Sequence, residues 1–231
     1  MITPLPFDSA LFGYPVGKCL VTDNWNEETF LKEAHPFQLV YLYSEKELSC
    51  KSSSIALVDV KLTYLEHLNQ EVSLPKDIQR WEGELQESLT HLALESGVYS
   101  RFKTDLRLKN GEFEKLYRLW IRKVWEKGEI FCATNQEGLV TVSVEGQLAK
   151  IGLLAVDSAY RKQGWGRKLV IAAEAFAIQM GAERMLIPTQ QKNLPACKLY
   201  RSLGYELTIT EWVYHWHQSP QPVISTLGEI S

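Results

Sequence analysis

Residues 150–166 read Lys-Ile-Gly-Leu-Leu-Ala-Val-Asp-Ser-Ala-Tyr-Arg-Lys-Gln-Gly-Trp-Gly and decide the fold of this chain. The apolar run 150–156 predicts a strand, the polar stretch 157–166 a tight loop, and residues 167–180 an amphipathic helix that stops at Gly181. A basic, glycine-containing loop at a helix N-terminus suits a phosphate, because free N–H groups and the helix dipole favour anions. Glycine also lets the main chain approach the ligand closely.

The glycines of this loop do not fit two familiar phosphate motifs. The chain has no G-x-x-x-x-G-K-[ST], and Gly164 and Gly166 lack the third glycine of a dinucleotide fingerprint. Positive charge gathers around the loop on Arg161, Lys162, Arg167 and Lys168. A plain strand–turn–helix with basic residues on a solvated turn is the alternative interpretation.

The order of elements can be predicted on both sides of the loop. For the C-terminal part we expect helices at 84–95 and 112–126, an irregular stretch at 97–105, strands at 129–134, 138–144 and 148–156, then strand 184–189, helix 193–202 and strand 205–216. For the N-terminal part we expect strands at 14–21, 37–43 and 55–65, and a helix at 26–34 capped by Asn24 or Asn26. The predicted domains are 1–76 and 77–217, followed by a mobile tail or crossing arm at 218–231.

Two motifs carry a family resemblance. Arg161-x-x-Gly164-x-Gly166 resembles the acyl-CoA pyrophosphate loop of the GCN5-related N-acetyltransferases (GNAT superfamily). Asn193-x-x-Ala196-x-x-x-Tyr200-x-x-x-Gly204-Tyr205 is similar to a later segment of the same family, in the same order. The resemblance implies an α/β fold with a mixed, mostly antiparallel twisted sheet, splayed between its strands four and five and flanked by helices. A smaller N-terminal α/β domain precedes it.

The resemblance also implies acyl-CoA, acetyl-CoA or a slightly larger thioester, as co-substrate, and no metal. The pantetheine arm would bond to the strand, its pyrophosphate would lie on the loop, and Asn193 would contact the arm or simply cap its helix. The implied cofactor residues are Leu153, Leu154, Ala155, Val156, Arg161, Lys162, Gln163, Gly164, Trp165, Gly166, Arg167 and Asn193.

Two residues are candidates for the chemistry. In many relatives the tyrosine at the position of Tyr200 protonates the departing thiolate; the alternative is a core aromatic with a satisfied hydroxyl. Asp59, in the strand at 55–65, matches a carboxylate that relays the amine proton; a lone strand aspartate with a structural role is the alternative. Cys197 has no histidine partner and is interpreted as a packing residue.

The acceptor is suggested by two further segments. Phe7-x-x-x-Leu11-Phe12-Gly13 and Ser100-Arg101-Phe102 look like parts of dTDP-fucosamine acetyltransferase and related sugar N-acyltransferases. Ser100, Arg101, Phe102 and Lys103 are therefore expected to contact a dTDP-linked amino sugar. This chain departs from that family at Lys103-Thr104-Asp105. A GNAT enzyme acting on a protein N-terminus or a polyamine, and a non-catalytic acyl-CoA-binding module, are the alternatives.

Composition narrows the class of protein. The chain has 231 residues, 45% of them hydrophobic, and a formal net charge of −3, which does not favour nucleic acid or an anionic membrane surface as partner. Four scattered cysteines and the lack of a signal sequence or long apolar run predict a cytoplasmic protein; a homodimer stays open. His215 and His217 share a strand face and are predicted to form a surface pair rather than a zinc site.

Overall fold

The computed structural model describes residues 1–68 and 72–218, so the predicted tail lies almost wholly outside the described residues. The strands form one ten-stranded sheet in the order β1-β2-β3-β10-β4-β9-β8-β7-β6-β5. The β2–β3 and β8–β9 pairs are parallel and the others antiparallel. Their bounds are β1 Thr3–Pro4, β2 Val16–Leu20, β3 Leu39–Ser44, β4 Ile55–His67, β5 Ile78–Arg80, β6 Ile130–Ala133, β7 Gly138–Glu145, β8 Leu148–Val156, β9 Arg184–Gln190 and β10 Glu206–His217.

Helices cover both faces of the C-terminal half of this sheet. Along β6, Ile130 and Cys132 pack with α3 and α5, whereas Phe131 and Ala133 pack with α6 and α7, as strand alternation requires. The predicted mixed, mostly antiparallel α/β sheet flanked by helices is thereby confirmed. The helices are α1 Pro6–Phe12, α2 Glu27–Ala34, α3 Glu87–Ser96, α4 Arg101–Thr104, α5 Glu112–Glu126, α6 Trp165–Gln179 and α7 Leu194–Ser202.

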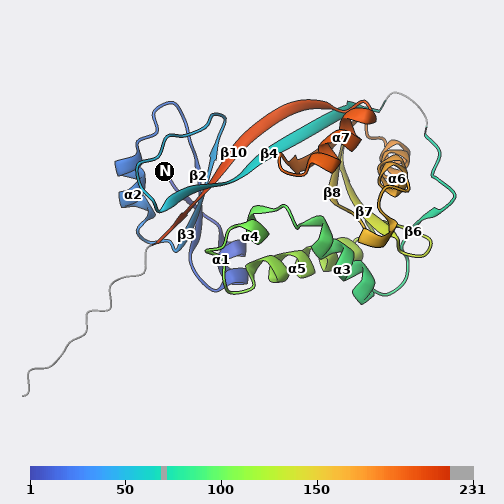
Figure 1. Cartoon of the computed structure of the whole chain (residues 1–231), viewed down its shortest axis with the longest axis horizontal. Coiled ribbons are helices and arrows are strands. Elements are labelled where there is room, and N and C mark those ends of the chain that lie inside the picture. Colours follow the sequence, from blue (N-terminus) through green and yellow to red (C-terminus); the bar gives the residue numbers. More distant parts are fainter. Residues whose placement is uncertain (69–71, 219–231) are drawn as a thin grey trace, which may run out of the picture.

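Two long strands join the N-terminal part to the rest. Figure 1 shows β4 and β10 running side by side from one end of the molecule toward the other. The C-terminal half of β10 also pairs with β3, while the C-terminal half of β4 pairs with β9. One sheet therefore carries both parts, and the domain division at residue 76 stays a prediction.

The sheet opens between β8 and β9. The two strands pair only over Leu148–Lys150 and Arg184–Leu186, although β8 continues to Val156. On its other side β8 stays paired with β7, with a register shift between Val140 and Val142. Counted from β5, these two strands are the fourth and fifth of the C-terminal part of the sheet, so the splay expected from the resemblance is present.

Several short elements were not predicted from the sequence. Helix α1 has seven residues and β5 has three, so neither is long enough for its periodicity to be recognised in the sequence. Helix α4 lies within the stretch expected to be irregular. Helix α6 begins at Trp165, two residues before the predicted start, because Gly164 adopts the left-handed conformation and becomes the N-cap.

Candidate active site

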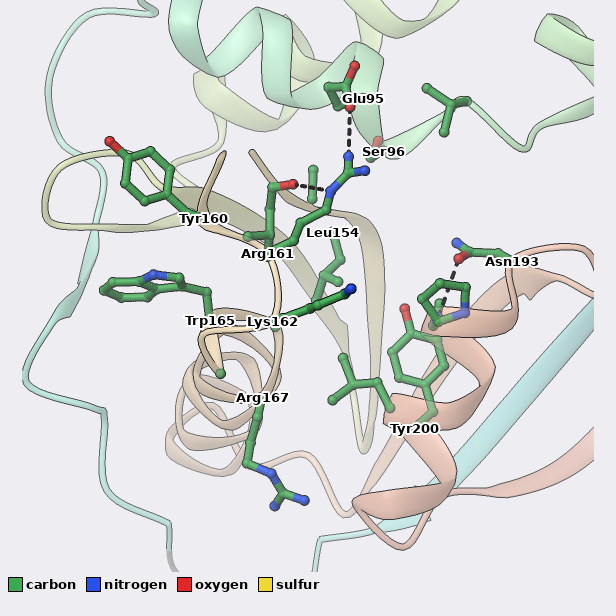
Figure 2. A pocket seen from close by; sticks show the side chains of 18 of the residues that line it. Glu95, Ser96, Leu154, Tyr160, Arg161, Lys162, Trp165, Arg167, Asn193 and Tyr200 are labelled. Atoms are coloured by element: carbon green, nitrogen blue, oxygen red, sulfur yellow. Dashed lines mark hydrogen bonds and ion pairs between the residues drawn. The ribbon is translucent and has the colours of Figure 1, made fainter. Parts of the chain in front are cut away.

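A cavity of about 730 Å³ lies where the sheet opens. Its walls come from the end of α3, the last residues of β8, the loop before α6 and the first turns of α7 (Figure 2). The predicted cofactor residues that line it are Leu154, Ala155, Val156, Arg161, Lys162, Gly164, Trp165, Gly166, Arg167 and Asn193, and the predicted catalytic residue Tyr200 lines it as well. Leu153 and Gln163 are absent from the lining. Sequence reasoning missed Glu95, Ser96, Val98, Tyr99, Tyr160, Pro195, Ala196 and Leu199.

The loop before α6 exposes main-chain N–H groups to this cavity. Lys162 (φ 63°) and Gly164 (φ 88°) both have left-handed backbones, which turn the chain sharply into α6. Among the residues that the structure describes, no side chain caps the start of α6, and its first N–H groups lack partners within the helix. A Cβ on Gly166 would lie 3.0 Å from a methyl carbon of Leu199, so glycine lets α7 approach α6 closely. Backbone shape and free donors together suit an anion.

The exposed edge of β8 supplies hydrogen-bonding groups for an extended ligand. Directly after β8, Asp157 N–H donates to the C=O of Glu137, the residue before β7, at 2.9 Å. Since antiparallel partners alternate between bonded and non-bonded pairs, the N–H and C=O of Val156 and Leu154 point away from β7, into the gap. Leu153 differs: its side chain is 2% exposed, and its N–H donates to Thr141 Oγ1 at 2.8 Å. The Leu153 amide is therefore already paired within the protein and does not face the gap as the amides of Leu154 and Val156 do.

The basic side chains around the loop have different partners. Arg161 donates to Glu95 at 2.8 Å and to Val156 C=O at 3.1 Å. Arg167 donates to Ser202 C=O at 3.1 Å, and Lys168 pairs with Asp77. In Figure 2 the Lys162 side chain extends between the loop and α7. The positive charge predicted around the loop is therefore partly committed to protein contacts.

Tyr200 is a buried phenol at the cavity wall. Its side chain is 3% exposed, and its ring packs on Tyr64 with centroids 5.7 Å apart. Within the described residues its hydroxyl has no protein hydrogen bond, and burial raises its pKa, so it stays protonated at neutral pH. Asn193 caps α7, its Oδ1 accepting from Ala196 N–H at 3.3 Å. Cys197 is buried in the core, as a packing residue should be.

Asp59 lies on β4 beside the end of β9. Two residues further along β4, Lys61 pairs with Gln190, the last residue of β9, and Gln191 N–H donates to Val60 C=O at 2.8 Å. The Asp59 side chain is 7% exposed. Burial raises the pKa of Asp59 to about 6, an effect that the nearby Arg101 guanidinium opposes. Asp59 does not line the cavity of Figure 2, but it lies toward the open end of the same gap.

The predicted acceptor residues lie outside that cavity, at the start of α4. Arg101 stands over the rings of Phe102 and Tyr41, 4.4 and 5.0 Å from their centroids, and donates to Tyr43 Oη at 3.0 Å. Ser100 Oγ, Arg101 Nε and Tyr41 Oη are buried without a hydrogen-bond partner among the residues described. Lys103 instead pairs with Glu114, at 3.3 Å. Arg101 is thus held by aromatic rings near Asp59, and its Nε–H remains available to donate to a ligand.

The prediction of a surface histidine pair was wrong. His215 is fully buried and its Nδ1 lies 2.7 Å from Asp105 Oδ2; His217 Nε2 lies 3.0 Å from the same oxygen. Burial lowers the pKa of His215 to about 3, and the surrounding hydrogen bonds lower the pKa of Asp105. Arg107 occupies both carboxylate oxygens of Asp105 as well. Its cation would repel a metal ion, so the cluster is interpreted as a link between α4 and β10.

Comparisons with known proteins agree with this geometry. A family model described as the acetyltransferase (GNAT) family matches residues 87–205. No curated protein matches the chain in sequence. Within residues 1–68 and 72–218, no helix has the length and apolar character needed to cross a membrane.

Solved structures share the fold at low sequence identity. A GCN5-related N-acetyltransferase from Sphaerobacter thermophilus is 14% identical with a TM-score of 0.56, covering 85% of this chain and 66% of its own. A putative GNAT-family acetyltransferase from Novosphingobium aromaticivorans is 15% identical, with a TM-score of 0.52 and coverage of 78% and 75%. A functionally unknown conserved protein from Staphylococcus epidermidis is 11% identical, with a TM-score of 0.60 and coverage of 89% and 84%. The chain thus spans slightly less than two thirds of the Sphaerobacter protein.

Proposed function

The chain belongs to the acetyltransferase (GNAT) family, and from this premise we propose that it transfers an acetyl or slightly larger acyl group from acyl-CoA to the amine of a dTDP-linked amino sugar. The family supports the transferase class and the CoA co-substrate. The observation that carries the proposal is the open β8 edge, which leads to an uncapped helix N-terminus and has the Tyr200 hydroxyl in its wall. The sugar acceptor, the homodimer and the cytoplasmic location stay predictions.

The cavity fits an acyl-CoA arm in shape and chemistry. Leu154 and Val156 would pair with pantetheine amides as a neighbouring strand does, a form of β-augmentation. The main-chain N–H groups of residues 162–167 would hold the pyrophosphate at the start of α6. The bound thioester then supplies the activated acyl group, and the gap beside β9 leaves room for the acceptor to arrive from the other side.

Two side chains would move protons. Asp59, with a pKa raised to about 6, is largely ionised near pH 7 yet basic enough to take the amine proton, directly or through water. As the amine nitrogen bonds to the acyl carbon and the C–S bond breaks, Tyr200 would donate its phenolic proton to the departing sulfur. The presence of both groups favours an enzyme over a non-catalytic acyl-CoA-binding module.

The charges near Asp59 favour an anionic acceptor. Arg101, Lys61 and Lys192 are the cations that act on the Asp59 carboxylate. A polyamine site would instead need several carboxylates. The Arg101 guanidinium, fixed on aromatic rings with Nε unpaired, suits a diphosphate or a stacked base. This favours a nucleotide-linked amino sugar over a polyamine.

A thermal-shift screen followed by an acetylation assay tests the proposal. Acetyl-CoA and dTDP-linked 6-deoxy amino sugars should each raise the melting temperature, because they bind the native state. Thiol release should follow with the sugar and not with spermidine or a peptide N-terminus. If spermidine or the peptide is turned over faster than the sugar, the proposed sugar acceptor is wrong.

A variant of the acceptor segment sharpens this test. Arg101→Ala should raise KM for the sugar about tenfold and leave KM for acetyl-CoA unchanged, since one charge-assisted contact is lost. Arg122→Ala, at an exposed position on α5, is the matched control. If only the KM for acetyl-CoA changes, α4 does not contribute to the acceptor site.

A further inference from the structure

The Arg161 side chain crosses the cavity from the loop to its opposite wall. Its Nη2 donates to Glu95 Oε2 at 2.8 Å, and its Nε donates to Val156 C=O at 3.1 Å. Figure 2 shows both bonds converging on the guanidinium group, between the end of α3 and the edge of β8. Glu95 and Arg161 both line the cavity, so this contact belongs to the site itself.

One of these bonds uses an acceptor that the cofactor needs. Val156 C=O faces the open gap, because the neighbouring Asp157 is the residue that bonds to Glu137, directly before β7. A pantetheine amide that adds to this edge would require the same carbonyl oxygen. The Arg161 bond therefore competes with a pantetheine amide for this carbonyl oxygen.

The other bond decides which ligands can move Arg161. Glu95 places a carboxylate in the wall of a site suited to anions, and only Arg161 pairs with it in the described structure. The pair is partly exposed, with side-chain exposures of 52% for Arg161 and 29% for Glu95, so it is weak enough to exchange. A pyrophosphate on the loop offers the guanidinium a stronger anionic partner than one carboxylate. A pantetheine group without pyrophosphate offers it none.

We propose that Glu95 and Arg161 form a latch that makes this site selective for acyl donors bearing a pyrophosphate, as CoA does. Glu95 holds Arg161 on Val156 C=O when the pyrophosphate is absent. When the pyrophosphate occupies the loop, Arg161 exchanges Glu95 for it and frees the carbonyl for the pantetheine amide. Donors that present pantetheine alone face the closed latch. This inference rests on the proposed use of acyl-CoA and names residues that select the donor.

Calorimetric titration with CoA and with pantetheine, which lacks every phosphate, tests the latch. Arg161→Ala should weaken CoA about tenfold, since the pyrophosphate loses a charge-assisted partner. The same variant should bind pantetheine about 2- to 5-fold more tightly, because Val156 C=O becomes free. Glu95→Gln should tighten both ligands by about 2- to 5-fold. Pantetheine is measured by competition against CoA if its direct signal is weak.

A matched control lies on the same helix. Glu87 pairs with Arg118 at 3.0 Å on α3, away from the cavity lining, and Glu87→Gln should leave both affinities unchanged. Equal weakening of CoA and pantetheine by Arg161→Ala, or weaker CoA binding by Glu95→Gln, overturns the latch. A wild-type chain that binds no CoA overturns the proposed function as well. If the wild-type chain binds CoA and a variant gives either of the first two results, the latch is overturned and the proposed function is not.

Discussion

Replacing Tyr200 by Phe tests the chemical step most directly. The change removes one hydroxyl and keeps the ring, which packs on Tyr64 and Tyr205 with centroids 5.7 and 6.3 Å away. Because that hydroxyl has no protein hydrogen bond within the described chain, no buried partner is left unsatisfied by its removal. The melting temperature should stay within about 2 °C of wild type, which corresponds to a change of about 0.5 kcal/mol.

The expected loss of rate follows from the role of the phenol. A positioned general acid contributes about 10²–10⁴-fold. Burial raises the pKa of Tyr200, which keeps the proton available but makes it a weaker acid, and a thiolate needs little protonation to depart. We therefore expect the low end, a fall in kcat of about 10²-fold, or about 2.7 kcal/mol of barrier.

Steady-state kinetics with CoA-thiol detection measure this effect, and titration with CoA measures the ground state. A loss of equal size in kcat and kcat/KM, with CoA affinity unchanged, would mark an interaction made only in the transition state. Turnover within about threefold of wild type, below about 0.7 kcal/mol of barrier, would refute the role. Tyr200 would then be a packing residue, and solvent would protonate the thiolate.

Three further outcomes follow from the structure. Gly164→Val should abolish CoA binding measurable by calorimetry while the fold still melts cooperatively, because a β-branched residue is strained at the Gly164 φ of 88°. Unchanged affinity for CoA would show that this loop is not part of the CoA site. For wild type, kcat/KM should rise with pH through about 6 as Asp59 ionises, and Asp59→Asn should abolish this rise. If the rise persists in the variant, another group is responsible for it. Asp105→Asn should lower unfolding free energy by about 2–3 kcal/mol in chemical denaturation, since Arg107 loses its buried anion. Asp23→Asn, in an exposed pair, is the control, and equal effects would refute the buried link.

Local patterns in the sequence determined the elements that build the cofactor side. An apolar run predicts β8, helical spacing predicts α5 and α6, and Asn193 predicts the start of α7; each was found within about two residues. These signals are reliable because their physical causes, which are the apolar character of a short segment, the helical period and capping, act between neighbours in the chain. The splay and the GNAT fold followed from motif order rather than from any one residue.

Contacts between distant segments were decided only by the tertiary structure. Glu95 and Arg161 are 66 positions apart, and Asp105 and His215 are 110 apart, so no local pattern pairs them. Leu153 lies in the strand that was predicted to contact the cofactor, but beside the β7–β8 register shift its N–H donates to Thr141 instead. The sequence analysis predicted His215 and His217 as a surface pair, yet Asp105 at the end of α4 lies over that face of β10, and His215 is buried. Burial and pairing depend on what the rest of the chain packs against a residue, which strand and helix periodicity do not encode.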